Sequence, residues 1–378
     1  MSESSDIPGH WKGTRTFVVD RKEAESQTVT SFYLRAEDGG LIAAYKPGQF
    51  LTFQLDIPGH DKQVVRSYTL SDSPGGINGG KLYRLSIKRE PSPPNMPDVP
   101  PGASSNYFHD HVEVGSTLQV IAPTGDFFLP DGGVGPVVLL SGGVGLTPMI
   151  SMLNHLVDQG ATRPVWFVHG VQNGSEHAFG GHVRQLAETH PSVQAHVVYT
   201  EPGPDDVEGR DFDDAGFITI PMLERLGTGR GAEFYLCGPP PFMQALYTAL
   251  REWGVDDSRI FYEFFGPATV LKGVPGDTST KPAAESAPTP AVNGVEVTFR
   301  WAEMTVPWDG ATETLLDLAE AHGVDADFSC RSGVCHTCAC TLLEGEIEYI
   351  NDDVFEPDEE GQILICSAIP KTNIVLDT

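Results

Sequence analysis

The first 130 residues contain short segments in which apolar and polar positions alternate, separated by turn residues. Segments 16–19, 49–55 and 82–87 are rich in Val, Phe, Leu and Tyr, and Gly, Pro, Asn or Asp stand at their borders. Such alternation is typical of strands in an antiparallel sheet. One helical stretch, at 105–112, interrupts the strands. The pattern predicts an antiparallel β-barrel.

From about residue 135 the pattern changes to apolar runs separated by amphipathic stretches. Helical periodicity is clear at 148–158 and 242–253. Alternation of strands and helices predicts a parallel, doubly wound sheet. The expected buried strands lie at 137–140, 165–168, 195–199, 233–236 and 260–264.

Residues 273–293 break this pattern, because they are rich in Pro, Ala, Ser and Thr and have almost no large apolar side chains. Such a stretch cannot bury enough apolar surface to fold and predicts a linker. A hairpin at 295–307, a helix at 314–321, a cysteine-rich loop and further strands follow it. The chain is therefore expected to be multi-domain, with a small α+β unit at its end.

The charge of the chain limits its partners. The net charge is −28, which argues against nucleic acid and anionic membranes. From Asn293 onward, 18 acidic residues stand against 3 basic ones. This excess is compatible with simple solubility, with a source organism that lives in salt, and with a docking face for a basic partner. No apolar run approaches the ~18 residues of a membrane span, and the acidic N-terminus is unlike a signal peptide, so a cytoplasmic location is expected.

The cysteines are concentrated near the end, where five of the six lie in the last 49 residues. Four of them follow the C-x4-C-x2-C…C spacing of plant-type [2Fe–2S] sites. A structural zinc site usually pairs two C-x2-C knuckles, and only one is present here. Cys340 is expected to be a bystander thiol, and Gly333 fits the bend of a cluster loop. The predicted cluster ligands are Cys330, Cys335, Cys338 and Cys366.

A glycine-rich segment, 141–148, follows the first parallel strand and opens its helix. Glycines allow the backbone to approach a dinucleotide pyrophosphate closely, and the helix N-terminus supplies partial positive charge. Pro148 is well placed in the first helical turn, where a missing N–H is tolerated. The segment predicts a nicotinamide dinucleotide site.

Through these motifs the chain resembles two known families. Residues 293–378 resemble a plant-type ferredoxin domain of β-grasp fold, and residues 11–271 resemble the ferredoxin–NADP reductase superfamily, most closely the reductase half of flavohaemoglobins. The resemblance implies a flavin-binding β-barrel at 1–132, an NAD(P)-binding α/β domain at 133–271, a linker at 272–292 and a [2Fe–2S] ferredoxin domain at 293–378.

The resemblance implies a flavin site, with FAD favoured over FMN. The family's Arg-x-Tyr-Ser/Thr motif matches Arg66, Ser67, Tyr68 and Thr69, in which the arginine pairs with a flavin phosphate and the threonine lies near flavin N5. The helix start expected to hold the flavin diphosphate comprises Gly102, Ser104, Ser105 and Asn106. Near the end of the α/β domain, Glu263 is expected beside the flavin ring and Phe265 over its face.

The resemblance also implies a nicotinamide site. Its phosphate loop comprises Gly142, Gly143, Gly145, Thr147 and Pro148, and its second segment comprises Cys237, Gly238 and Pro239. Cys237 is expected near nicotinamide C4, so the catalytic set is Thr69, Cys237, Glu263 and Phe265. No Lys or Arg stands at 169–176 or 199–206, and Glu201 would repel a 2′-phosphate. NADH is therefore favoured over NADPH.

The order flavin, nicotinamide and ferredoxin matches the reductase components of Rieske-type oxygenases. The expected function is an NADH-dependent oxidoreductase that passes single electrons through FAD and [2Fe–2S] to a monooxygenase or demethylase. A reductase for another redox protein, such as hybrid cluster protein, and a [2Fe–2S] redox sensor remain as alternatives. A monomer that docks its acceptor through the acidic ferredoxin domain is expected. No globin segment precedes Trp11, so nitric-oxide dioxygenase activity is not expected to carry over.

Overall fold

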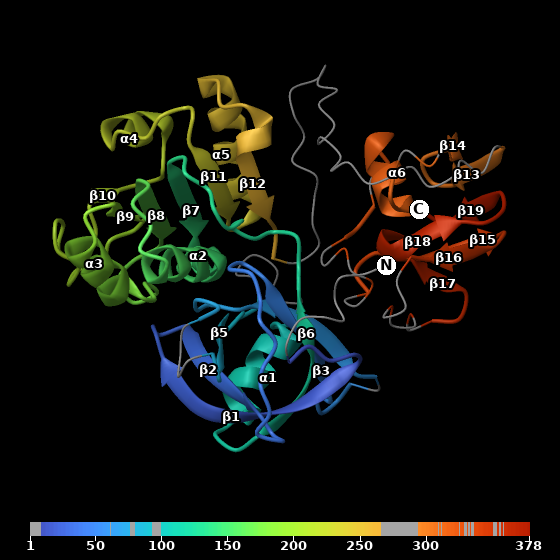
Figure 1. The fold of residues 1–378 in the computed structure, drawn as a ribbon, viewed down its shortest axis with the longest axis horizontal. Coiled ribbons are helices and arrows are strands. Elements are labelled where there is room, and N and C mark those ends of the chain that lie inside the picture. Colours follow the sequence, from blue (N-terminus) through green and yellow to red (C-terminus); the bar gives the residue numbers. More distant parts are fainter. Residues whose placement is uncertain are drawn as a thin grey trace. The chain divides into compact units, whose positions relative to one another are not determined.

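The computed structural model divides into two compact units, Met1–Glu263 and Phe264–Thr378, which are described separately (Figure 1). The predicted linker at 272–292 lies outside the described residues, and the predicted domain boundaries remain predictions. The structure describes residues 9–60, 62–75, 80–92, 100–265, 294–308, 310, 312–324, 326–328, 331, 333, 336–350, 354, 357 and 359–378.

The first unit begins with a six-stranded antiparallel sheet in the order β4-β3-β6-β1-β2-β5. An antiparallel bridge between Leu70 and Leu85 joins its two edges, so the sheet closes into the predicted barrel. Helix α1 (Ala103–His111) sends Phe108 into the barrel core. The strands are β1 (Thr14–Ala24), β2 (Val29–Ala36), β3 (Phe50–Leu55), β4 (Val64–Thr69), β5 (Tyr83–Lys88) and β6 (Thr117–Thr124).

The second sheet of this unit is parallel and has the order β10-β9-β8-β7-β11-β12. The predicted strands and helices of a doubly wound fold are confirmed. The strand order reverses between β7 and β11, and such switch points are where α/β sheets bind ligands. The strands are β7 (Val137–Gly142), β8 (Val165–Val171), β9 (Val193–Tyr199), β10 (Asp214–Ala215), β11 (Glu233–Cys237) and β12 (Ile260–Glu263); the helices are α2 (Leu146–Asp158), α3 (Gly180–Thr189), α4 (Ile220–Arg225) and α5 (Pro240–Trp253).

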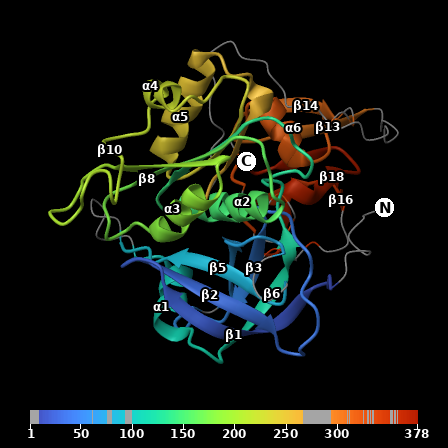
Figure 2. The same cartoon turned by 60° about the vertical axis from the view of Figure 1, so that its left-hand side comes forward.

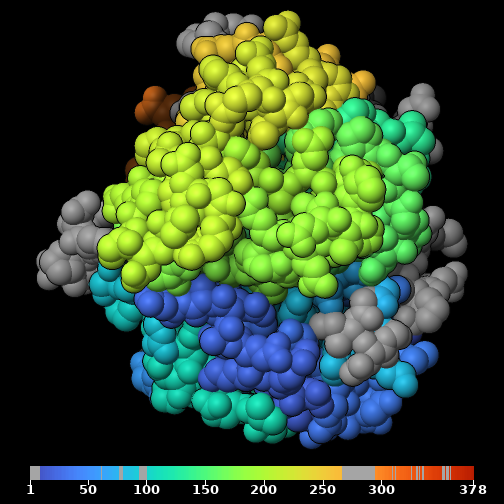
Figure 3. All heavy atoms as spheres, turned by 90° about the vertical axis from the view of Figure 1, so that its left-hand side faces the viewer, coloured from blue at the N-terminus to red at the C-terminus, as the bar shows by residue number. Residues whose placement is uncertain are grey.

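The barrel and the parallel sheet pack against each other within this unit. Val29 of β2 and Phe127, which follows β6, belong to the core cluster of the α/β part. Helix α2 lies on the side of the parallel sheet that faces the barrel (Figures 1 and 2). Residues of the α/β part, coloured green to yellow, lie directly on barrel residues, coloured blue (Figure 3). The sequence pattern did not predict this seam.

The second unit has a mixed five-stranded sheet in the order β14-β13-β19-β15-β17, a two-stranded sheet of β16 and β18, and helix α6 (Leu315–Ala321). Thr314 caps α6 by accepting a hydrogen bond from the Asp317 N–H at 3.2 Å. The predicted hairpin and helix are confirmed, in a layout that fits a ferredoxin domain. The strands are β13 (Val295–Phe299), β14 (Met304–Trp308), β15 (Ala339–Glu344), β16 (Ile347–Tyr349), β17 (Gln362–Leu364), β18 (Ala368–Pro370) and β19 (Ile374–Leu376).

A search of the described helices for a membrane span found none of sufficient length and hydropathy.

Candidate functional site

Strand β4 presents the predicted flavin motif at one edge strand of the barrel sheet. Arg66 is exposed, whereas Thr69, at the end of the strand, is buried. The Arg66 guanidinium donates a hydrogen bond to the Val65 carbonyl at 2.7 Å and forms no ion pair with any described residue. Ser67 shares a hydrogen bond of 2.8 Å with Thr52 on β3. Arg66 is thus an exposed cation available to an anionic ligand.

Tyr68 connects this strand to helix α1. Its phenol shares a hydrogen bond of 2.8 Å with the Ser104 hydroxyl, and its ring packs edge-on against Phe108 at a centroid distance of 5.2 Å. Burial raises the pKa of Tyr68 to about 12, so the phenol is neutral at physiological pH. The two segments predicted to bind flavin are therefore fixed to each other.

The N-terminus of α1 fits a diphosphate, because no side chain caps it. Ser105 and Asn106 hold the preceding segment instead. The Ser105 hydroxyl donates to the Gly102 carbonyl and accepts the Glu90 N–H, both at 3.2 Å, while the Asn106 amide donates to the Glu90 carbonyl at 2.8 Å. A Cβ on Gly102 would lie 2.8 Å from the Ser105 hydroxyl oxygen. Gly102, Ser105 and Asn106 thus hold the chain in place at the start of α1.

The glycine-rich segment forms a 3₁₀ turn, Gly143–Gly145, between β7 and α2. Gly143 has φ +53°, which favours glycine. A Cβ on Gly145 would lie 2.2 Å from the Cys237 carbonyl oxygen, so this loop touches the end of β11 backbone to backbone. Thr147 is buried and donates to the Val144 carbonyl at 3.2 Å, and Pro148 is buried in the first turn of α2. The backbone of this glycine-rich loop fits a dinucleotide phosphate.

The second nicotinamide segment, Cys237 to Pro239, continues from β11. A Cβ on Gly238 would lie 3.1 Å from Gly142 Cα, and Pro239 caps α5 from an exposed position. Burial raises the pKa of the Cys237 thiol well above its usual value. Cys237 is therefore a neutral thiol at neutral pH.

Glu263 and Phe265 lie where the parallel sheet ends. In the register of the sheet Cys237 has Ser141 as its partner on β7 and Glu263 as its partner on β12. Burial, and next the charge of Asp126, raise the pKa of Glu263 to about 8. The Glu263 Oε2 atom is buried and has no hydrogen-bond partner in the described part of the chain. Phe265 stands two residues after Glu263 and is 43% exposed, as a ring available for stacking would be.

The sequence reasoning missed His169, a fully buried side chain beside the phosphate loop. Its Nδ1 shares a hydrogen bond of 2.9 Å with the Ser141 hydroxyl, and its ring lies 5.5 Å from that of His177. Burial lowers the pKa of His169 to about 3, so the imidazole is neutral. A single histidine in an apolar run does not indicate from the sequence that it is buried beside the phosphate loop.

The carboxyl ends of β8 and β9 are acidic, as the sequence predicted. Glu201 is exposed and accepts a hydrogen bond from Gln172 at 2.9 Å. Asp206 accepts the N–H groups of Gly174 and Gly203 at 3.1 and 2.7 Å. Arg210, which lies outside the segments considered from the sequence, donates to the Asp205 carbonyl at 3.2 Å but is paired with Asp211.

In the second unit, Cys338 and Cys366 are both 3% exposed and belong to the same core cluster. A Cβ on Gly333 would lie 2.8 Å from the hydroxyl oxygen of Ser367, the residue after Cys366, so the cysteine loop and the Cys366 turn are in contact. Arg331 pairs with Asp317 at 3.1 Å and with Glu320. The other two predicted ligands, Cys330 and Cys335, lie outside the described residues.

Cys340 is less buried than these two cysteines. It is partly buried and lines a cavity of about 420 Å³ together with Cys338, Gln362 and Asp377. Burial, and next the charge of Cys338, raise the pKa of Cys340 to about 12. Within the described residues, no three His, Cys, Asp or Glu side chains gather as a metal site.

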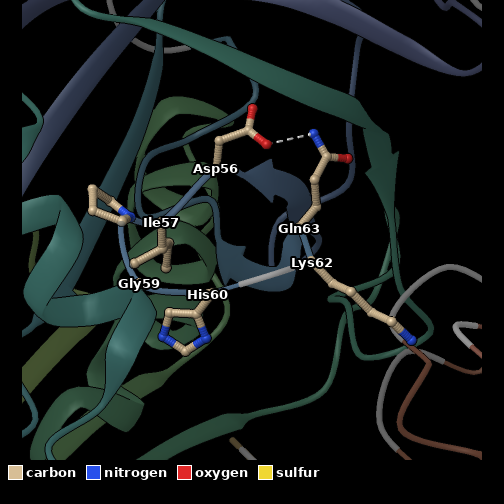
Figure 4. Close-up of a pocket in the computed structure, with 7 residues that line it drawn as sticks. Asp56, Ile57, Gly59, His60, Lys62 and Gln63 are labelled. Carbon is tan, nitrogen blue, oxygen red and sulfur yellow. Dashed lines mark hydrogen bonds between the residues drawn. The ribbon is translucent and has the colours of Figure 1, made fainter.

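A surface hollow of about 330 Å³ lies in the turn between β3 and β4 (Figure 4). Asp56 accepts a hydrogen bond from Gln63 at 3.1 Å across it, and the Lys62 side chain extends away from the hollow (Figure 4). No predicted site residue lines it.

Comparison with known families matches three models to separate parts of the chain. Residues 16–129 match the oxidoreductase FAD-binding domain, residues 139–247 the oxidoreductase NAD-binding domain, and residues 298–371 the 2Fe-2S iron-sulfur cluster binding domain.

Individual proteins are similar to large parts of the chain. The FAD/NAD-binding domain of nitric oxide dioxygenase from Vibrio cholerae O1 biovar El Tor is 36% identical, with a TM-score of 0.59, over 68% of this chain and all of that one. The chain belongs to the ferredoxin–NADP reductase superfamily. A flavohemoprotein from Halalkalibacterium halodurans is 44% identical over 71% of the chain, which spans only 64% of that relative's length.

One superfamily member has the same layout along nearly its whole length. Phthalate dioxygenase reductase, described as a modular structure for electron transfer from pyridine nucleotides to [2Fe–2S], covers 97% of this chain and 98% of its own. Its identity is 22% and its TM-score 0.53, so it shows the shared fold alone.

For this chain, the predicted fold class and the predicted FAD, NADH and [2Fe–2S] cofactors are confirmed at the level of domains. The chain is a pyridine-nucleotide-dependent oxidoreductase with an FAD-binding part, an NAD-binding part and an iron–sulfur domain. The roles of individual residues remain predictions.

Proposed function

We propose that this protein takes electrons from NADH and passes them through FAD and a [2Fe–2S] cluster to an oxygenase component, a Rieske-type monooxygenase or demethylase. One observation carries the first half of the proposal. The register of the parallel sheet aligns Cys237 with Ser141, beside the phosphate loop, and with Glu263. Cys237, expected beside the nicotinamide, and Glu263, expected beside the flavin ring, therefore lie next to each other at the carboxyl-terminal end of the sheet.

Flavin, when bound, supplies the chemistry that converts a two-electron hydride donor into a source of single electrons. Arg66 and the uncapped start of α1 would hold its phosphates by charge and by backbone N–H groups. Tyr68, fixed by Ser104 and Phe108, would flank its ring system. Thr69 would face the reacting edge of the ring.

Two neutral groups complete the proposed site. The raised pKa of Glu263 keeps a proton on its carboxyl group at neutral pH, where it is a hydrogen-bond donor rather than a charge. The neutral Cys237 thiol adds no negative charge that would oppose the arrival of hydride. Phe265 would cover the ring in the absence of nucleotide and give way to nicotinamide.

NADH is the proposed donor because the ends of β8 and β9 carry carboxylates. Glu201 is exposed there, and Asp206 is fixed by two backbone N–H groups. Arg210, a cation whose side chain reaches this loop, is paired with Asp211. A 2′-phosphate would meet net negative charge.

The proposed electron exit is the ferredoxin unit, with Cys330, Cys335, Cys338 and Cys366 as cluster ligands. The buried Cys338 and Cys366 and the close approach of Gly333 support this assignment. The acidity of residues 293–378 supports a basic docking surface on the acceptor. The domain layout shared with phthalate dioxygenase reductase favours an oxygenase as that acceptor.

The test is reconstitution of the holoprotein with candidate acceptors. NADH should reduce ferricyanide at the flavin, and a Rieske-type oxygenase should receive electrons at a rate that falls as salt rises, because salt screens docking over a Debye length of about 8 Å. NADH oxidation that supports another redox protein but no oxygenase would refute the proposed acceptor. A flavin that NADH does not reduce would refute the proposal as a whole.

A further inference from the structure

A largely buried polar cluster lies in the seam between the barrel and the parallel sheet, where apolar packing would be expected. Its members come from the loop after β4 and from helices α2 and α3, and we call it the Asp72 cluster: Asp72, Ser73, Ser151, Asn154, Asp158 and His182. Ser151 is fully buried, Ser73 is 3% exposed, and Asp72 and Asn154 are each 8% exposed, whereas His182 is partly buried and Asp158 is exposed. Buried polar groups are costly unless every partner is in place, so such a cluster favours one particular orientation of the parts that it joins.

Helix α2 contributes one continuous polar face to this cluster. Ser151, Asn154 and Asp158 are spaced i, i+3 and i+7, which places them on one side of the helix. The Ser151 hydroxyl donates to the Asp72 carbonyl at 2.6 Å, and the Asn154 amide donates to the Asp72 carboxylate at 2.9 Å. The Ser73 hydroxyl donates to Asp158. Two turns of α2 are thus fastened to two consecutive barrel residues.

Asn154 is the central connector. Because the Asp72 carboxylate can only accept, the Asn154 Nδ2 atom faces it, and the Oδ1 atom is left to accept a hydrogen bond from His182 Nε2 at 2.7 Å. Burial lowers the pKa of His182, so its ring is neutral and the proton on Nε2 is committed to this bond. Asn154 therefore ties the barrel loop to both α2 and α3.

A second contact crosses the same seam nearby. The Arg84 guanidinium of β5 lies 3.7 Å from the Asp72 carboxylate and 4.8 Å from the centre of the Phe179 ring. Phe179 has φ +59°, a backbone conformation that a bulky side chain rarely adopts. Such strain persists where the surroundings enforce it, here at the start of α3 against the barrel.

The cluster connects the two cofactor segments by a very short route. Asp72 stands three residues after Thr69, the residue expected at the reacting edge of the flavin, and Ser151 stands one helical turn after Thr147 of the phosphate loop. We infer that Asp72 and Asn154 are positioning residues, which set the placement of the nucleotide-binding helix relative to the flavin strand. This inference rests on the proposed function, because it concerns the alignment of NADH with flavin.

The test separates alignment from binding. Asn154→Ala leaves the flavin motifs on the barrel and the nucleotide motifs on the parallel sheet, so each cofactor should still bind. The limiting rate of flavin reduction by NADH, followed anaerobically by stopped flow, should fall by about 10- to 100-fold, since misplacement by ~1 Å has an effect of this order. The dissociation constant of NADH from the same traces should change by less than about threefold.

Matched variants control for a merely structural role. Thr228→Ala removes another buried hydrogen bond of the α/β part, 3.0 Å to the Leu223 carbonyl, and should lower the melting temperature without slowing flavin reduction. Asp72→Asn keeps an oxygen that accepts from Asn154 and should retain a rate within about threefold of wild type. If Asn154→Ala does not retain flavin, Ser151→Ala, which removes one hydroxyl, carries the test with an expected loss of threefold or more.

The outcomes are distinct. In one, NADH reduces the flavin of wild type rapidly while Asn154→Ala or Ser151→Ala is reduced as fast as Thr228→Ala. That result would overturn the positioning role and leave the proposed function intact. A loss that appears only in NADH affinity would overturn it as well. A wild-type flavin that NADH does not reduce would refute the proposed function, and the positioning role with it.

Discussion

Replacement of Gly145 by alanine should disable the nicotinamide site while leaving both electron carriers in place. A Cβ there would lie 2.2 Å from the carbonyl oxygen of Cys237, 2.4 Å from its carbonyl carbon and 2.7 Å from the Gly238 nitrogen. All three are backbone atoms, and ordinary contact begins at 3.4 Å. The phosphate loop and the end of β11 must therefore separate by about 1 Å, a misplacement that reduces catalysis by roughly 100-fold.

The assay is anaerobic reduction of the flavin by NADH, compared with chemical reduction of the same sample by dithionite. Gly181→Ala is the matched control, because a Cβ built there has no atom within 4 Å apart from its chain neighbours and the backbone of its own helix, and its φ lies outside the positive range. Gly145→Ala should lose NADH-dependent reduction by about 100-fold and keep its dithionite response, whereas Gly181→Ala should behave as wild type. Equal NADH rates in the two variants would refute the close-approach argument.

Three further predictions concern the other sites. Cys338→Ser and Cys366→Ser should each abolish the visible absorbance of the [2Fe–2S] cluster while NADH–ferricyanide activity persists, and Cys340→Ser should keep the cluster; the reverse pattern would show the ligand assignment to be wrong. The kcat/KM for NADH should exceed that for NADPH, and Glu201→Arg should raise the NADPH value about tenfold; equal use of both by wild type would refute the proposed preference. Because burial raises the pKa of Glu263 from 4.5 to about 8, the native state binds the extra proton, so the free energy of unfolding should fall as pH rises from about 4.5 to 8, and Glu263→Gln should flatten this slope in thermal melts at a series of pH values. At ~1.4 kcal/mol per pKa unit the upper limit of that fall is roughly 5 kcal/mol, and an unchanged slope in the variant would contradict the assignment.

Much of the fold was predictable because its signals are local. Alternation in 16–19 and 82–87 depends only on the two faces of a strand, and both segments fall within or at the border of barrel strands. The helix expected at 314–321 begins where Thr314 can cap it. The cysteine spacing near the C-terminus and the glycines of 141–148 are likewise sequence patterns, so they can be recognised without the structure.

The environment of the candidate site was less predictable, because it depends on residues far apart in the chain. Tyr68 and Ser104 are 36 residues apart, yet their hydrogen bond joins the two flavin segments. The raised pKa of Glu263 arises from burial and from Asp126, which lies far earlier in the chain. The sequence shows an acidic residue in an apolar strand, which is rare. Its protonation state, however, follows only from three-dimensional packing.

Helix α2 shows why the seam could not be derived from the pattern alone. Polar residues at helical spacing normally mark the face that meets water, and Ser151, Asn154 and Asp158 have that spacing. In the folded protein Ser151 and Asn154 are buried against the barrel loop and only Asp158 is exposed, while the apolar residues on the other sides of α2 pack on the parallel sheet. The helix is therefore buried on both sides, one by apolar contacts and one by hydrogen bonds. Apolar contacts tolerate small sliding movements, whereas hydrogen bonds fix distance and direction. A polar seam is thus the kind of contact expected where two cofactor-binding parts must keep a fixed alignment.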